Sequence, residues 1–168
     1  MTEYWMDSDS LMTPKDGPYA FKLLPQFWEL VEAKAAEGVI ASSSFVYDEI
    51  CDAYDHDPLK QWAQARKGPP LFLTPCETAQ QCMNEVAEYV NSAYQHQAWI
   101  AHFLSKADPW MIAHCKAHGG KIVTFEKLHG QGAHEPKIPN VCRALGLPDP
   151  INTWEMLAEM DVSFAGDA

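Results

Sequence analysis

The chain has 168 residues, of which 47% are apolar and 21% are charged. This composition indicates one globular domain and excludes a disordered, collagenous or coiled-coil chain. The 12 Lys and Arg residues face 23 Asp and Glu residues, and the resulting net charge of −11 opposes broad electrostatic binding to nucleic acid. No stretch approaches the roughly 20 apolar residues of a membrane span, and the first residues do not resemble a secretory signal. We therefore expect a cytoplasmic protein without membrane contact.

Short apolar runs alternate with helical patterns along the chain. Strands are expected at residues 4–6, 39–41 and 122–125, with a brief extended piece at 71–73. Helices are expected at residues 25–37, 44–54, 58–66, 74–94, 98–106, 108–118 and 152–160. The clearest unit has Asp108 as N-cap, Pro109 at the first helical position and Gly119 and Gly120 as its stop. The alternation predicts an α/β fold, a three-layer α/β/α sandwich with a mainly parallel central sheet.

Acidic residues from distant parts of the chain are expected at one edge of this sheet. Asp7 ends the first strand, Glu126 ends the strand after the two glycines, and Asp108 begins the helix that leads into that strand. In open parallel sheets, sites form at the carboxyl ends of the strands. Glu49 joins this edge because the apolar stripe of residues 45–53 turns it inward, while its acidic neighbours face outward.

Several carboxylates at one point repel one another, and a hard divalent cation with oxygen ligands is the usual way to stabilise them. We therefore expect magnesium or manganese at this edge. Each acid also has an ordinary explanation, because Asp108 suits a helix cap, Asp7 a turn, and Glu126 a surface charge pair with Lys127. Asp9 is expected to make local hydrogen bonds rather than to bind the metal directly.

Several segments together carry a resemblance to a known family. They are Met6-Asp7-Ser8-Asp9-Ser10-Leu11, residues 46–50, residues 107–113, residues 122–127 and residues 137–142. In order and spacing they resemble the PIN-domain family of metal-dependent ribonucleases, and in particular a bacterial PIN-like subfamily of unknown function. The resemblance covers nearly the whole chain, so residues 1–168 are expected to form one PIN-like domain.

The resemblance implies a metal-dependent endoribonuclease. The family's first Asp falls on Asp7, its helix Glu on Glu49 and its third acid on Asp108. Glu126 stands where members often have a fourth Asp, and its longer side chain is expected to reach the metal through water. Asp9 stands where many members have Asn or Ser. Metal-activated water would attack the RNA phosphodiester in line and leave 5′-phosphate and 3′-hydroxyl ends.

The resemblance also implies partners. Small bacterial PIN proteins are often the toxins of type II toxin–antitoxin pairs, which implies a cognate antitoxin protein and a homodimer. RNA is the expected substrate, held locally by the phosphate-binding side chains of Lys121, Lys127, Lys137 and Arg143. The alternative for these cations is that they balance the surface of an acidic protein.

Two other functions remain open. Asp7-Ser8-Asp9 after an apolar strand also resembles the opening motif of haloacid-dehalogenase-type phosphatases, with Asp7 as nucleophile and Asp9 as acid. That family expects Thr or Val in place of Leu11 and an acidic pair late in the chain, and neither is present. The second alternative is a PIN-like binding module without catalysis, which the inward position of Glu49 opposes.

The remaining chemically versatile side chains have mostly structural interpretations. The five cysteines include no C-x-x-C pair, so reduced and mostly buried thiols are expected. His114 and His118 have the spacing of a zinc pair, but no further Cys or His supports it, and a patterned helix surface is preferred. The six tryptophans could stack on RNA bases, but most recur at helical spacing and are expected in the core.

Overall fold

A computed structural model describes residues 1–52, 56–130, 132 and 134–164. The strands are β1 (Tyr4–Met6), β2 (Ile40–Ser43), β3 (Phe72–Leu73) and β4 (Lys121–Val123). The helices are α1 (Ser8–Asp16), α2 (Pro25–Ala36), α3 (Ser44–Cys51), α4 (Pro58–Gln64), α5 (Glu77–Ala93), α6 (Gln97–Leu104), α7 (Asp108–His118), α8 (Ile138–Ala144) and α9 (Thr153–Glu159). The strands pair in the order β3-β2-β1-β4, and all three pairings are parallel.

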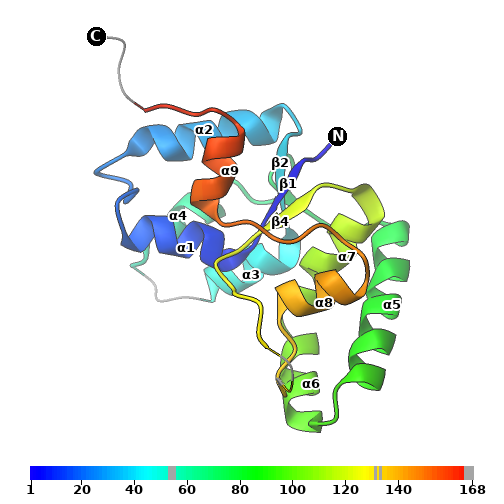
Figure 1. The fold of residues 1–168 in the computed structure, drawn as a ribbon. Coiled ribbons are helices and arrows are strands. Elements are labelled where there is room, and N and C mark those ends of the chain that lie inside the picture. Colours follow the sequence, from blue (N-terminus) through cyan, green and yellow to red (C-terminus); the bar gives the residue numbers. More distant parts are fainter. Residues whose placement is uncertain (53–55, 131, 133, 165–168) are drawn as a thin grey trace.

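The expected three-layer α/β/α sandwich is confirmed. Helices α1, α2, α4 and α9 lie on one side of the sheet, and α5, α7 and α8 lie on the other (Figure 1). Strand β1 is central, and Tyr4, Trp5 and Met6 are all buried. A parallel strand that is covered on both faces needs this continuous apolar run rather than an alternating pattern.

Strand β1 is packed closely against the end of α7 and the start of β4. The Trp5 ring stacks on His114 of α7 with the ring centroids 4.8 Å apart, and its Nε1 donates to the carbonyl of Gly119 at 2.9 Å. Gly120 has φ 88°, and a Cβ there would lie 2.8 Å from the carbonyl oxygen of Glu3. Glycine at this position therefore lets the chain turn from α7 into β4 directly beside β1.

Most predicted elements are present with shifted ends. Helix α7 covers the predicted residues, but its N-cap is Ala107, and Asp108 is the first helical residue without a capping hydrogen bond, so the predicted N-cap is wrong. Strand β2 extends two residues beyond the predicted 39–41, to Ser43. Strand β4 ends at Val123, two residues earlier than predicted. Helix α3 ends at Cys51, with Asp52 as its C-cap, and residues 53 and 54 of its predicted range lie outside the described residues.

Two helices are not predicted by the sequence patterns. Helix α1 contains Pro14 and follows Asp7 where a turn is expected, and α8 carries Pro139 in its first turn within a stretch without a predicted element.

All five cysteines are free, and Cys82, Cys115 and Cys142 are buried as expected. Within the described ranges, no helix has both the length and the apolar character needed to cross a membrane.

Candidate functional site

The structure brings five acidic side chains to the carboxyl edge of the sheet: Asp7, Asp9, Glu49, Asp108 and Glu126. We call them the acidic cluster. Asp7 follows β1, Asp9 lies in the first turn of α1, Glu49 lies on α3, Asp108 begins α7 and Glu126 follows β4. Because these elements start or end at the same edge of a parallel sheet, their side chains meet although the residues are far apart in sequence.

Asp7 is the most deeply buried member, with 4% of the residue exposed. Its Oδ2 accepts a 3.3 Å hydrogen bond from Thr124 Oγ1, but its buried Oδ1 accepts none. Burial first, and then the charges of Asp108 and Asp9, raise the pKa of Asp7 well above its ordinary value. An unsatisfied carboxylate oxygen among like charges is costly, so this position is not explained by a turn alone.

Glu49 connects the start of α1 to the start of α7. Its Oε1 accepts a 2.8 Å hydrogen bond from the backbone N–H of Ala107, and its Oε2 accepts a 3.0 Å bond from Ser8 Oγ. The predicted orientation of α3 is confirmed, because Glu49 is partly buried while Asp48 on the same helix is exposed. Glu49 therefore holds the beginning of α7, and with it Asp108, close to Asp7.

Asp108 is 7% exposed at the first position of α7. Burial and the nearby charge of Glu126 raise the pKa of Asp108 to about 7, against a smaller lowering by Lys106, and Glu49 adds to the increase. The carboxyl group therefore exchanges its proton near neutral pH. Such a perturbed acid in a cluster of acids is typical of functional sites.

Asp9 is tied to the segment after β4. Its carboxylate accepts 3.1 Å hydrogen bonds from the backbone N–H of Phe125 and from Thr124 Oγ1. Asp9 makes the expected local hydrogen bond, with the backbone of Ser10. The donors Phe125 and Thr124 lie more than 110 residues away in sequence, because α1 carries Asp9 to the end of β4. Burial raises the pKa of Asp9, and the hydrogen bonds from Phe125 and Thr124 oppose this increase.

Glu126 lies three residues beyond β4 rather than at its end. Its Oε2 accepts a 2.9 Å hydrogen bond from the backbone N–H of Ile138, and its Oε1 lies 3.8 Å from Lys137 Nζ. Lys127 does not pair with it in the described residues, so the charge pair expected between these neighbours is formed with Lys137 instead.

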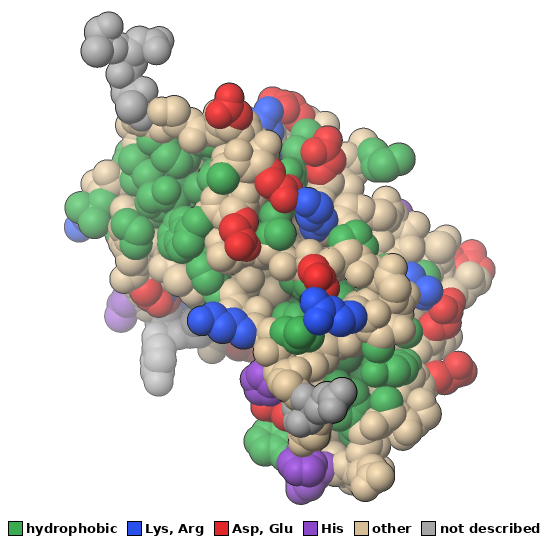
Figure 2. Space-filling view, in the orientation of Figure 1, with side chains coloured by type: hydrophobic (Ala, Val, Ile, Leu, Met, Phe, Trp, Pro, Cys, Tyr) green, Lys and Arg blue, Asp and Glu red, His purple; other side chains and the backbone are tan. Residues whose placement is uncertain are grey.

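The predicted phosphate-binding cations do not gather at one place. Lys121 begins β4, at the amino edge opposite the acidic cluster, and pairs with Glu159 at 2.7 Å, so its assignment to the site is wrong. Arg143 forms an exposed ion pair with Asp149. Figure 2 shows Lys and Arg interspersed with Asp and Glu on the visible face, without a continuous basic patch. Lys127, which is exposed, and Lys137 remain next to the cluster in sequence.

Two positioning residues escaped the sequence reasoning. Thr124 Oγ1 lies within hydrogen-bonding distance of the carboxylates of Asp7 and Asp9, and it accepts a bond from the backbone N–H of Glu126. Ser8 Oγ holds Glu49. For Thr124 the sequence signal is a hydroxyl residue at the end of an apolar run, two residues before Glu126.

The alternative of a zinc pair at His114 and His118 finds no support in the described residues. His114 is 1% exposed, and neither of its ring nitrogens has a hydrogen-bond partner. His118 Nε2 lies 3.5 Å from Cys76 Sγ, and the two His rings stack with centroids 6.1 Å apart. The preferred alternative, a patterned helix surface, is wrong for His114, because its ring is buried against Trp5.

The donor set of the acidic cluster suits a hard cation. Carboxylate oxygens are the preferred ligands of magnesium and manganese, and Asp7 Oδ1 is a buried acceptor without a partner. Over the described residues, however, no group of three or more His, Cys, Asp or Glu side chains is arranged so that it could already hold a metal ion. Glu49 instead uses both of its oxygens in hydrogen bonds within the protein.

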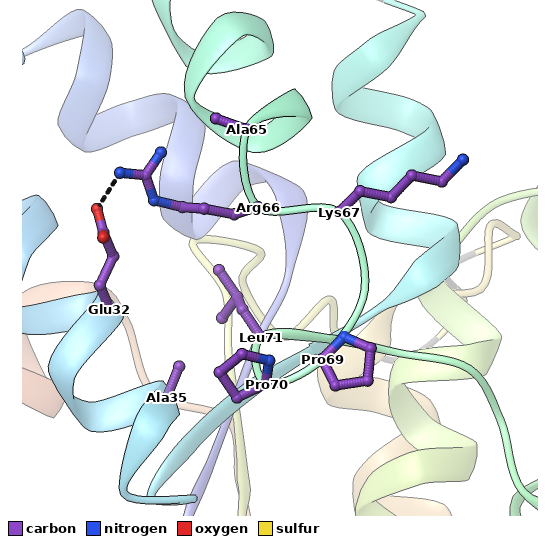
Figure 3. A pocket seen from close by; sticks show the side chains of 8 residues that line it. All are labelled: Glu32, Ala35, Ala65, Arg66, Lys67, Pro69, Pro70 and Leu71. Atoms are coloured by element: carbon purple, nitrogen blue, oxygen red, sulfur yellow. Dashed lines mark ion pairs between the residues drawn. The ribbon is translucent and has the colours of Figure 1, made fainter.

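A cavity on another part of the molecule is separate from the acidic cluster. Figure 3 shows it, with a volume of about 330 Å³, lined by Glu32, Ala35, Ala65, Arg66, Lys67, Pro69, Pro70 and Leu71. Glu32 and Arg66 form a 2.6 Å ion pair there. Leu71 immediately precedes β3, and Ala35 lies shortly before β2, so the cavity is at the amino edge of the sheet.

Comparison with known protein families matches residues 4–164 to a family described as a domain of unknown function (DUF4411). The match therefore includes every member of the acidic cluster. No curated protein and no solved structure matches the chain.

Proposed function

The chain belongs to the family described as a domain of unknown function (DUF4411), and on that premise we propose that it is a magnesium- or manganese-dependent endoribonuclease of the PIN type. The observation that carries the proposal is the buried Asp7, with an unpartnered Oδ1, beside the carboxylates of Asp108, Asp9 and Glu49. A fold that gathers unpaired acids loses stability, and such a loss is typical of a functional constellation.

The residues of the acidic cluster and their hydrogen-bond donors would have different roles in this reaction. The residues that would hold the cation are Asp7, Glu49 and Asp108. Glu126 would contact the cation through a water molecule. A divalent cation held there would supply a water of lowered pKa and would neutralise charge on a phosphate. Without the cation Asp108 exchanges a proton near neutral pH, and a bound cation would keep it in the charged form. Thr124 and Ser8 keep the carboxylates of Asp9 and Glu49 in place.

The geometry favours this proposal over a haloacid-dehalogenase-type phosphatase. In that mechanism Asp9 would donate a proton to the leaving group and would need access to the substrate. Here both Asp9 oxygens accept hydrogen bonds from Phe125 and Thr124. Asp9 is therefore better suited to holding the segment after β4 than to moving a proton.

The biological setting in the proposal comes from the PIN resemblance. We propose that the nuclease is the toxin of a type II toxin–antitoxin pair, held inactive by a cognate antitoxin and able to form a homodimer. Purification from the native host would test this setting, because a bound small protein whose removal releases RNA cleavage is the expected result. Nuclease activity that is unchanged by removing every co-purifying protein would contradict it.

The nuclease is tested with purified protein, free of any bound protein, on single-stranded RNA. Cleavage should require magnesium or manganese, stop with a chelator and leave 5′-phosphate ends. Asp7→Asn and Asp108→Asn should abolish cleavage, while the exposed Asp149→Asn should retain it. If the wild type cuts no RNA with either metal, or if Asp7→Asn cuts equally well, the enzyme is excluded and the binding module takes its place.

A further inference from the structure

The start of α5 and the end of α7 bring a thiol and an imidazole together. Cys76 is the N-cap of α5, and His118 is the last residue of α7. The two helices lie side by side on one face of the sheet (Figure 1). Cys76 Sγ lies 3.5 Å from His118 Nε2, which is within hydrogen-bonding distance for sulfur. The two residues are 42 positions apart in sequence, so the packing of the helices creates this pair.

The orientation of the His118 imidazole is fixed by stacked rings. It stacks on the ring of Trp5, with the centroids 5.7 Å apart, and Trp5 is itself buried in the central strand. On the same side lies the ring of His114, 6.1 Å away, whose pKa is lowered to about 4 by burial. His114 is therefore neutral near pH 7 and places no second positive charge beside His118. In the tautomer with its proton on Nδ1, His118 accepts the thiol proton at Nε2.

Cys76 is accessible to small molecules. It is exposed, and so are Glu77 and Thr78 after it. Its side chain makes no capping hydrogen bond, so the start of α5 does not use the sulfur. The amino end of a helix carries a partial positive charge, which stabilises negative charge on a sulfur at that place.

The other four cysteines do not combine exposure with a base. Three of them are buried: Cys82, Cys115 and Cys142. Burial raises the pKa of each of these thiols, which keeps them in the unreactive protonated form. Cys51 is half-buried, and its side chain forms a hydrogen bond with that of Tyr47. Cys76 is therefore the exposed thiol with an imidazole at hydrogen-bonding distance.

The pair fits a nucleophile and its base better than a metal site. A structural zinc ion takes four protein ligands, whereas Cys76 and His118 offer two, and the described residues add no third. A thiol within reach of a base, with the base oriented by a further group, is the arrangement of an activated nucleophile. Here Trp5 is the orienting group.

The charge around Cys76 narrows the class of reagent. Glu77 follows directly and is exposed, and the net charge of the chain is −11. The cation on the same pair of helices, Lys116, already pairs with Glu85 at 3.2 Å. Anionic reagents are therefore repelled, while uncharged ones approach without this cost.

We propose that Cys76 is a modification site, where the thiol attacks a small uncharged disulfide with His118 as its base. The Cys76 sulfur forms a bond to one sulfur of the reagent, and the disulfide bond of the reagent breaks. The thiol proton passes to His118 Nε2 and from there to the sulfur that leaves. The products are a mixed disulfide on Cys76 and one small thiol, so no further oxidant is needed. The site lies at the opposite end of α7 from Asp108, and the inference does not depend on the proposed nuclease.

The exchange experiment treats the reduced protein with 2-hydroxyethyl disulfide at about pH 7 and follows the adduct by intact mass and peptide mapping. The wild type should gain one adduct, on Cys76, about tenfold faster than N-acetylcysteine reacts. His118→Ala should remove this advantage, and added imidazole should restore part of it, which a merely structural residue would not allow. His102→Ala, at an exposed imidazole on α6, is the matched control and should react like the wild type.

Several results would overturn the proposal. One is a wild type that reacts no faster than N-acetylcysteine, and another is an adduct that forms on Cys51 as fast as on Cys76. A folded His118→Ala protein with the wild-type rate would exclude His118 as the base. Should His118→Ala fail to fold, His118→Gln makes the same comparison with a side chain of similar size. The anionic dithiodiglycolate should react more slowly than 2-hydroxyethyl disulfide, and equal rates would overturn the reagent class.

Discussion

Replacing Asp108 by Asn should stabilise the protein when no metal is present. The pKa of Asp108 is raised from 3.8 to about 7, mainly by burial and by Glu126. The folded state therefore binds this proton more tightly than the unfolded state, and deprotonation opposes folding. The penalty begins near pH 4, grows as the pH rises to about 7 and is constant above that. The amide of Asn has no such charge.

The size of the effect follows from the two pKa values. Each pH unit between them is worth about 1.4 kcal/mol, so the penalty reaches at most about 4 kcal/mol near pH 8 and is below about 1 kcal/mol near pH 4. Since the amide still has to find partners and Asp7 relaxes when a neighbouring charge is removed, we expect a net gain of about 2 kcal/mol near pH 8. For a domain of this size that raises Tm by about 4–8 °C.

The assay is thermal and urea unfolding in a chelating buffer at about pH 8 and about pH 4. Asp149→Asn, at an exposed ion pair, should shift stability by less than about 0.5 kcal/mol and serves as the control. Asp108→Asn protein that is correctly folded but melts at or below the wild-type temperature near pH 8 would refute the reasoning. It would show that the Asp108 carboxylate stabilises the fold, which is the role expected of a purely structural residue at the start of a helix.

Three further substitutions, one of them with a matched control, test features other than the Asp108 carboxylate. His114→Phe should stabilise the protein by about 1 kcal/mol near pH 8, because it removes two unpartnered ring nitrogens. Burial lowers the His114 pKa to about 4, so the wild type loses stability as the pH falls from about 6.5 to about 4, and the advantage of Phe measured by urea unfolding should grow over that range. Lys127→Ala should reduce the slope of RNA affinity against salt by about one, whereas Lys121→Ala, at the amino edge, should leave the slope unchanged. Gly120→Ala should lower Tm, because its Cβ would meet the carbonyl of Glu3 at 2.8 Å in a left-handed backbone conformation.

The parts of the fold that the sequence predicts well are those with strong local signals. The helix from Asp108 to His118 is bounded by a proline and by two glycines, and the capping box of Asn152 and Glu155 is present with both of its hydrogen bonds. The helix after Asp7 was missed because Pro14 and weak amphipathicity mask it, and it is stabilised by tertiary contacts such as the burial of Leu11.

The candidate site was partly predictable for a geometric reason. The edge of a parallel sheet is fixed by the strand direction, so the meeting of Asp7, Glu49 and Asp108 follows once the strands are recognised. The roles of Thr124 and Ser8 do not follow, because they depend on which side-chain atoms face each other. Lys121 was misplaced because its sequence neighbourhood is basic while its position at the start of β4 puts it at the far edge.

The order of the strands has a consequence for the growing chain. Strand β1 lies between β2 and β4, so during synthesis it waits for one of its two partners, which is made more than 110 residues later. Until Thr124 and Phe125 arrive, Asp9 has no donors from that segment, and the Asp108 carboxyl enters only with α7. A chain broken off before β4 lacks Glu126 and the donors that hold Asp9, so it cannot assemble the acidic cluster.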